Sequence, residues 1–160
     1  MKVLLTGSSK GIGYKIAKDL LVEGHELALH YNKNESTLDA LLKKDKTGSF
    51  SIQADLSQQQ EIKKMVVNTI DKLSFPDCII NNAGIAESAD ISLDIDSWSN
   101  MFDKTIDVNL KAPTLIFKEF LKYKRDKKIN SRLRIINIAS RAAFRGEQQD
   151  YISYACSKGG

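Results

Sequence analysis

The sequence lacks the features that mark several classes of protein. No run of apolar residues approaches the ~20 that a membrane-spanning helix needs, and "MKVLLTGSS" reaches glycine and serine too early for a signal peptide. The two cysteines, Cys78 and Cys156, form no CxxC pair and no metal-ligand spacing, so we expect both to pack and no metal to bind. Because the chain also has no internal repeat and no low-complexity linker, we expect one cytoplasmic domain over residues 1–160, with no membrane contact.

Charge of one sign gathers in one place only. Much of the net charge of +4 lies in "KEFLKYKRDKK" at 118–128. A basic cluster can attract nucleic acid, but no aromatic stacking pattern accompanies it. The alternative is the cationic end of a solvated helix, which the helix dipole favours. We therefore predict no nucleic-acid partner.

Short apolar runs alternate with helical patterns along the whole chain. The runs predict five strands, at 2–6, 26–31, 49–55, 78–84 and 133–140. Between them, apolar spacing predicts helices at 11–24, 35–44, 57–73 and 96–123, and a last helix opens near the C-terminus. Strand–helix alternation with continuous apolar strands is typical of a parallel sheet that is buried on both faces. The predicted fold class is α/β, a doubly wound parallel sheet of the Rossmann type.

A glycine-rich turn joins the first strand to the first helix. "TGSSKGIG" places glycines at 7, 11 and 13. A dinucleotide's pyrophosphate needs close approach to backbone, which only glycine allows, and a helix N-terminus offers unpaired N–H groups. Between a strand and a helix, this trio predicts a dinucleotide site.

The end of the second strand indicates which dinucleotide binds. NAD-binding units usually place an acid there, on the ribose 2′-hydroxyl, but "LHYNKNES" has no carboxylate before Glu35. Asn32 and Lys33 occupy the turn, and Lys10 lies in the glycine loop. Because lysines attract a 2′-phosphate that an acid would repel, we predict NADP(H), with NAD(H) possible.

A tyrosine and a lysine near the C-terminus can form an acid–base pair. Tyr154 and Lys158 share a helix face, whereas Tyr151 has Ala155 at the same offset. An ammonium one turn away favours phenolate and so lowers the pKa of a tyrosine. Ser140 ends the fifth strand at the edge where such sheets bind ligands, and can donate to a carbonyl oxygen.

Together these motifs resemble the short-chain dehydrogenase/reductase family. The match is to the N-terminal two-thirds of its TGxxxGxG branch, which includes 3-oxoacyl-[acyl-carrier-protein] reductases. The resemblance implies an oxidoreductase that transfers hydride between NADP(H) and a carbonyl or alcohol, with Tyr154 as general acid/base. "NNAG" at 81–84 would line the nicotinamide ribose, and "ADLS" would place Asp55 and Leu56 at the adenine. "DVNL" would place Asn109 in a water relay to Lys158, and Lys158 would also bind the nicotinamide ribose.

The predicted site residues are therefore these. The catalytic set is Asn109, Ser140, Tyr154 and Lys158. The cofactor-binding set is Gly7, Ser9, Lys10, Gly11, Ile12, Gly13, Asn32, Lys33, Asp55, Leu56, Asn82, Ala83, Gly84, Tyr154 and Lys158.

Two departures from the family pattern leave alternatives open. The interval from Ser140 to Tyr154 is one residue longer than the commonest pattern, and the tyrosine helix is cut short after Gly160. The domain is thus expected to be incomplete at its C-terminus, with strand 133–140 as an open edge. One alternative is an inactive nucleotide-binding module; another, a nucleotide-sugar epimerase, fits less well because epimerases resemble TGxxGxxG. A full-length form is expected to be a homo-oligomer.

Overall fold

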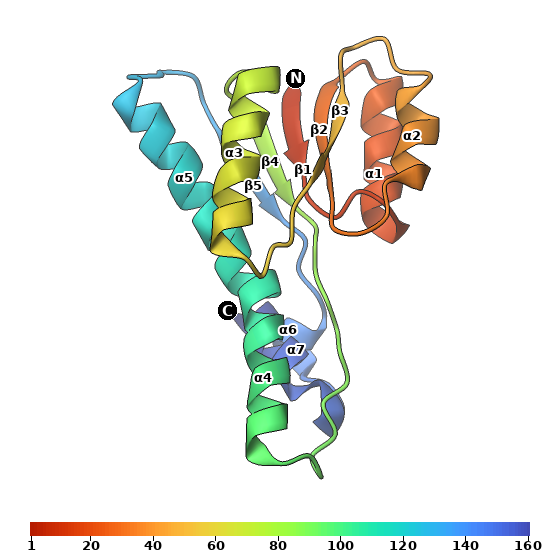
Figure 1. The fold of residues 1–160 in the computed structure, drawn as a ribbon, viewed down its shortest axis with the longest axis vertical. Helices are drawn as coiled ribbons and strands as arrows, with labels where there is room; N and C mark the ends of the chain where they lie inside the picture. The colour runs from red at the N-terminus through yellow and green to blue at the C-terminus, as the bar shows by residue number, and fades with distance from the viewer.

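A single parallel sheet lies between two layers of helices in the computed structural model, which describes all of residues 1–160 (Figure 1). Its five strands are β1 (Lys2–Leu5), β2 (Glu26–Tyr31), β3 (Phe50–Gln53), β4 (Cys78–Asn81) and β5 (Arg134–Asn137). They run in the order β3-β2-β1-β4-β5, and each neighbouring pair is parallel. The strand order reverses between β1 and β4, so the predicted doubly wound Rossmann sheet is confirmed.

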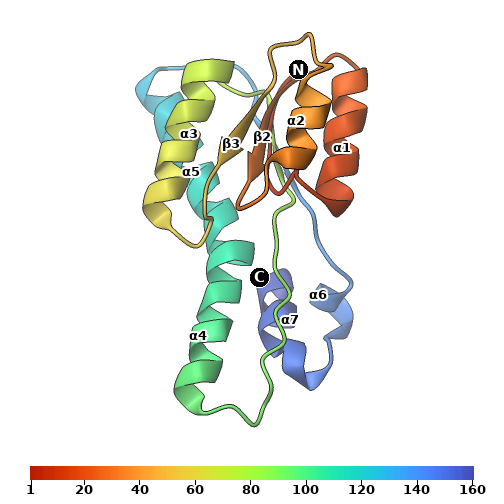
Figure 2. The same ribbon diagram turned by 45° about the vertical axis from the view of Figure 1, so that its right-hand side comes forward.

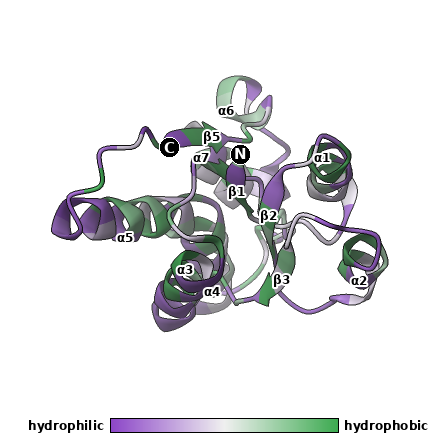
Figure 3. Ribbon diagram, turned by 90° about the horizontal axis from the view of Figure 1, so that it is seen from above, coloured by the Kyte–Doolittle hydropathy of each residue, from purple (hydrophilic) through white to green (hydrophobic).

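The helices fall into three groups. α1 (Gly11–Val22) and α2 (Ser36–Leu42) cover one face of the sheet, and α3 (Gln59–Leu73) and α5 (Ala112–Asp126) cover the other (Figure 3). α4 (Ile95–Ile106), α6 (Ala142–Arg145) and α7 (Ile152–Gly159) lie beyond the carboxyl ends of the strands, with a 3₁₀ turn (Gln149–Tyr151) before α7 (Figures 1 and 2). None of these helices has the length and apolar character needed to cross a membrane.

The core is split in two by the alternation of side chains along the strands. Leu4, Ala28 and Ile79 point towards α3 and α5 and belong to one buried cluster. Their neighbours Leu5 and Leu29 point the other way, into a second cluster with α1 and α2. The central strands are thus buried on both faces, as their continuous apolar runs predict.

Several strands end earlier than the sequence suggests. β4 stops at Asn81 rather than at residue 84, because the chain turns away to meet the first loop. The N–H groups of Asn82 and Ala83 donate to Thr6 Oγ1 at 3.0 and 3.1 Å instead of joining the sheet. The residues lost from the predicted strand are therefore the ones that shape the carboxyl edge.

β5 departs from the expectation of strands buried on both faces. It pairs with β4 alone, and Ile136 is 46% exposed. The expected open edge is thus present, and it carries an apolar side chain.

The two cysteines have different surroundings. Cys78 is buried in β4 as expected, but the expectation that Cys156 packs is wrong, since it is exposed. α7 buries Ser153 and Ser157 instead, and Cys156 lies outside that buried side.

Candidate active site

The glycine turn between β1 and α1 has a shape that side chains would prevent. Gly7 and Gly11 adopt positive φ angles of 66° and 55°, which L side chains rarely tolerate. Gly13 is helical, but a Cβ there would lie 2.1 Å from Gly7 O and 2.4 Å from Asn82 Nδ2. A Cβ on Gly7 would likewise lie 2.7 Å from Ala83 Cα. Close packing therefore requires glycine at positions 7 and 13, and the positive φ angles favour it at positions 7 and 11.

The turn presents unpaired donors at the start of α1. The first helical hydrogen bond runs from Tyr14 N–H to Lys10 O, and the N–H groups of Gly11, Ile12 and Gly13 have no acceptor within the chain. No acidic side chain occupies the first turn of α1, and Lys10 is exposed beside it. Three free N–H groups at the positive end of a helix dipole are suited to an anion such as a phosphate.

Three neighbouring parts of the chain hold the turn in place. Directly after β4, the Asn82 amide donates to Thr6 O at 3.0 Å and to Gly7 O at 2.9 Å. From β2, the ring of His30 accepts a hydrogen bond from Gly7 N–H at 3.0 Å. Thr37, in α2, donates its hydroxyl to Ser9 O at 2.6 Å. The turn is thus fixed by side chains from three different parts of the chain.

The loop after β2 exposes its polar side chains, whereas its one carboxylate is hydrogen-bonded to residues of the strands. Asn32 and Lys33 are exposed, and Asn32 O accepts from Gln53 Nε2 at 2.9 Å. The Glu35 carboxylate accepts hydrogen bonds from Ser51 and Tyr31, which lower its pKa. The first acid after β2 is therefore directed towards β3 and the end of β2.

Asp55 and Leu56 follow β3 at the same edge. Asp55 Oδ1 accepts from the N–H and the hydroxyl of Ser57, at 2.9 and 2.8 Å, and its own N–H donates to Glu61. Leu56 is buried in the core. These hydrogen bonds hold the segment at the carboxyl edge of the sheet, the edge where Rossmann folds bind their ligands.

A π-helical turn interrupts the long helix predicted at 96–123. α4 and α5 are continuous through Asp107–Lys111, whose extra residue per turn shifts the helix phase. Asn109 lies in this turn and is buried. Pro113, four residues further on, has no N–H, so the carbonyl of Asn109 lacks its α-helical donor.

The side chain of Asn109 connects three parts of the site. Its Oδ1 accepts from Ile85 N–H at 2.8 Å, and its Nδ2 donates to Ile85 O at 2.8 Å and to Ser157 Oγ at 2.9 Å. Gly84 lies against it, since a Cβ there would be 3.4 Å from Asn109 Oδ1 and 3.7 Å from Lys158 Nζ. The loop after β4, the π turn and α7 therefore meet at one point.

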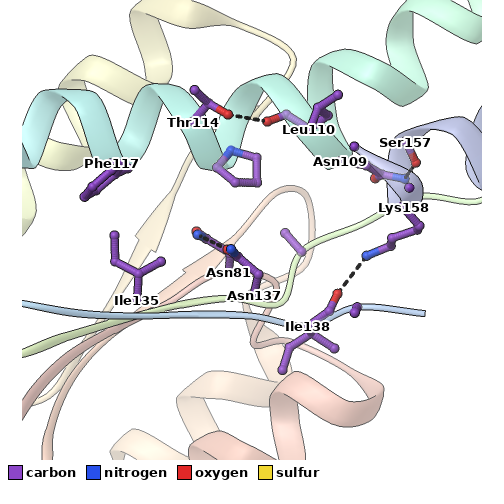
Figure 4. A pocket seen from close by; sticks show the side chains of 15 residues that line it. Asn81, Asn109, Leu110, Thr114, Phe117, Ile135, Asn137, Ile138, Ser157 and Lys158 are labelled. Atoms are coloured by element: carbon purple, nitrogen blue, oxygen red, sulfur yellow. Dashed lines mark hydrogen bonds between the residues drawn. The ribbon is translucent and has the colours of Figure 1, made fainter. Parts of the chain in front are cut away.

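Tyr154 and Lys158 lie on α7 as the predicted pair. Lys158 Nζ donates to Ile138 O at 2.9 Å (Figure 4). The same nitrogen lies 5.9 Å from the centre of the Tyr154 ring. Ser140 is less closely joined to them. Its Oγ accepts from Ala142 N–H at 3.2 Å, in the turn that opens α6, and no hydrogen bond links it to Tyr154.

A cavity of about 360 Å³ opens beside this pair, between α5 and β5 (Figure 4). Lys158 and Asn109 lie at one end, and Phe117 and Ile135 lie among its apolar lining. Asn81, which donates to Asn137 at 2.8 Å, contributes a buried Oδ1 with no hydrogen-bond partner.

Comparison with known proteins agrees with this geometry. A family model described as short chain dehydrogenase matches residues 1–160. The chain belongs to the short-chain dehydrogenase family. It is 33% identical over 112 residues to 3-oxoacyl-[acyl-carrier-protein] reductase FabG of Staphylococcus epidermidis, covering 68% of this chain but 45% of that relative.

Solved structures of the family superpose over almost the whole chain. A 4-hydroxyisoleucine dehydrogenase complexed with NADH is 30% identical with a TM-score of 0.83, over 99% of this chain and 62% of that one. A metagenomic blue fluorescent protein in complex with NADPH is 26% identical with a TM-score of 0.81, over 99% of this chain and 63% of that one. The chain thus spans about half to two-thirds of the length of the relatives it matches.

Two residues in this short-chain dehydrogenase site were missed from the sequence. Ser157 joins Asn109 to α7, and its position directly before Lys158 was the available signal. His30 lies in an apolar strand, and its contact with Gly7, 23 residues away, has no sequence signature.

Proposed function

We propose that this chain is the cofactor-binding and proton-transfer part of an NADP(H)-dependent oxidoreductase. Its substrate class is a carbonyl compound or the corresponding alcohol, and Tyr154 is the general acid/base. The observation that carries the proposal is the position of Lys158 Nζ, 2.9 Å from Ile138 O and 5.9 Å from the Tyr154 ring centre. A cation held there can stabilise the negative charge that the tyrosine oxygen carries once it has given its proton to a substrate.

The glycine turn fits a dinucleotide's pyrophosphate. Side chains at Gly7 and Gly13 would fill the space that the backbone needs, and the three free N–H groups of α1 are suited to phosphate oxygens. Ser9, Lys10, Gly11 and Ile12 would complete this contact. Asp55 and Leu56 would hold the adenine, and Asn82, Ala83 and Gly84 would line the nicotinamide ribose with Tyr154 and Lys158.

The charge pattern around β2 supports NADP(H) over NAD(H). Lys10 is exposed in the glycine turn, and Lys33 is exposed in the loop after β2. Glu35, the first acid after β2, is engaged by Ser51 and Tyr31. A 2′-phosphate would therefore meet two cations and the amide of Asn32 rather than a free carboxylate.

Four polar groups of the site have roles in the proposed proton transfer. When bound, NADPH supplies the hydride. The Tyr154 hydroxyl gives its proton to the carbonyl oxygen, and the Lys158 ammonium stabilises the phenolate that remains. The Ser140 hydroxyl donates to the same oxygen as negative charge develops there. The carbonyl of Asn109, which Pro113 leaves without an α-helical donor, can accept from a water that passes protons to Lys158.

A second candidate function is nucleotide binding without turnover. One observation favours it: the Ser140 hydroxyl is engaged by Ala142 N–H and makes no hydrogen bond to Tyr154.

Titration of NADPH and then a turnover assay separates the two functions. The oxidoreductase proposal expects saturable NADPH binding and NADPH-dependent reduction of a panel of ketones and aldehydes. Binding without reduction of any of them would favour the second function. Absence of binding to NADPH and NADH would contradict both.

A further inference from the structure

His30 is a buried histidine that the chemistry above does not use. It lies near the end of β2 and is 2% exposed. Its ring makes two hydrogen bonds to backbone, one to Gly7 N–H at 3.0 Å through Nδ1 and one to Ala54 O at 2.9 Å through Nε2. Its own carbonyl accepts from the N–H and the hydroxyl of Ser8, at 2.9 and 2.8 Å.

The partners of the ring determine its protonation state. Gly7 N–H can only donate, so Nδ1 must be unprotonated, while Ala54 O can only accept, so Nε2 must carry the proton. The ring is therefore neutral, in a single tautomer. Burial also lowers the pKa of His30, against the weaker raising effects of the Ala54 hydrogen bond and the Asp55 charge.

The two backbone groups belong to opposite ends of the proposed adenosine-diphosphate site. Gly7 is in the glycine turn, at a φ of 66°. Ala54 directly precedes Asp55 and Leu56, the proposed adenine contacts. One ring thus bridges the phosphate turn and the adenine segment from the strand between them. Replacement by an apolar ring would leave the partly buried N–H of Gly7 and the buried carbonyl of Ala54 without this partner.

We propose that His30 is a positioning residue that couples the glycine turn to the 54–56 segment, and that the cofactor site is correctly formed only while its ring is neutral. This proposal rests on the dinucleotide site proposed above. If Nδ1 were protonated, it and the Gly7 nitrogen would each point a hydrogen at the other, and neither could accept a hydrogen bond. The glycine turn would therefore have to move.

The charged groups around the His30 ring do not prevent the clash between a protonated Nδ1 and the Gly7 N–H. Asp55 acts on the ring from the segment after β3, and Glu61, on α3, accepts from the N–H of Asp55. The glycine turn presents only the backbone of Gly7 and the backbone and hydroxyl of Ser8.

The direction of the pH effect follows from the lowered pKa. The unfolded chain takes up a proton near the ordinary histidine pKa of 6.5, whereas the folded ring resists it until lower pH. The contribution of His30 to stability is therefore full above 6.5 and falls as pH drops below that value, until the folded ring is also protonated. Cofactor affinity is expected to fall when the folded ring is protonated.

The test compares His30→Phe, His30→Asn and the matched control His25→Asn, which removes the only other histidine. We expect His30→Phe to weaken NADPH binding about tenfold, as for roughly one lost buried hydrogen bond. We expect His30→Asn, which keeps an acceptor towards Gly7, to retain more affinity and to lose the acid-side fall. His25→Asn should keep both the affinity and the pH profile.

Amide hydrogen exchange in the protein without cofactor gives an independent readout. The Gly7 amide should be protected in the wild type and in His25→Asn, and should exchange faster in His30→Phe. Unchanged Gly7 protection in a folded His30→Phe variant would overturn the coupling, whatever the cofactor does. If the exchange result is as expected but no form binds NADPH, the coupling stands and the proposed cofactor function fails. Equal NADPH affinity of His30→Phe and wild type from pH 5 to 8 would overturn the proposal.

Discussion

Gly13→Ala isolates the steric demand of the glycine turn. The added Cβ would lie 2.1 Å from Gly7 O, 2.9 Å from Gly7 C and 2.4 Å from Asn82 Nδ2. Two of these three atoms are backbone, so the turn itself must move. Alanine is favoured over glycine within a helix by about 1 kcal/mol, whereas overpacking costs about 3 kcal/mol at the upper end of its usual range. We therefore expect a net loss of about 2 kcal/mol in the free energy of unfolding.

Thermal unfolding measures this loss, since about 2 kcal/mol corresponds to a fall in Tm of roughly 4–8 °C for a chain of this size. The displaced N–H groups of α1 should also weaken NADPH binding, on the order of 100-fold if two hydrogen bonds to phosphate are lost. The matched control is Gly159→Ala, where the same added Cβ meets nothing within 4 Å. That control should leave stability unchanged or raise it. A Gly13→Ala protein with unchanged Tm and NADPH affinity would refute the reasoning.

Three further outcomes are expected. Replacing Lys10 and Lys33 together with alanine should weaken NADPH binding far more than NADH binding in parallel titrations; equal losses would contradict the NADP(H) preference. Ser157→Ala removes an acceptor of Asn109 and should lower the free energy of unfolding by about 1 kcal/mol, whereas Ser153→Ala, whose buried Oγ has no partner, should be neutral or stabilising in the same denaturation assay. Ile136→Lys, on the exposed edge strand β5, should reduce self-association of residues 1–160 in analytical ultracentrifugation; an unchanged size distribution would show that this edge does not pair.

The order and type of the main elements could be predicted because local pattern determines them. Each central strand is a continuous apolar run, and each flanking helix has apolar residues on one side, so burial on the two faces of a sheet follows from the sequence. Several strands were predicted to extend further at their C-terminal ends than they do. Asn82 and Ala83 lie within the strand predicted at 78–84, but their N–H groups donate to Thr6 Oγ1, which is 76 and 77 residues away in the chain.

The parts of the site that were missed depend on contacts distant in sequence. His30 is one polar residue in "ELALHY", and nothing nearby indicates that its ring joins Gly7 to Ala54. The π turn at Asn109 is likewise hidden, because a single turn of five residues is too short to be recognised from apolar spacing that is read over the whole helix. The apolar run of β5 predicts burial on both faces like that of the other strands, although its edge was expected to be open. Its faces are exposed because burial depends on which neighbours are present and not on the strand's own residues.

Two expectations stay predictions: that the domain is incomplete at its C-terminus, and that a full-length form is a homo-oligomer. The expected edge at β5 is present, and the chain covers 62% of the 4-hydroxyisoleucine dehydrogenase structure.

The most direct test of the proposed chemistry is a pair of conservative tyrosine variants, Tyr154→Phe and Tyr151→Phe. Both are assayed for NADPH binding and for NADPH-dependent ketone reduction, in a form of the protein that turns over. Tyr154 lies beside Lys158, 5.9 Å from its ammonium, whereas Tyr151 has an alanine at the same helical offset. We expect Tyr154→Phe to lower kcat by about 10²–10⁴-fold, the usual contribution of a general acid, with NADPH affinity unchanged. Tyr151→Phe should keep most activity. Full activity in Tyr154→Phe, or loss of activity confined to Tyr151→Phe, would contradict the assignment of Tyr154 as the proton donor.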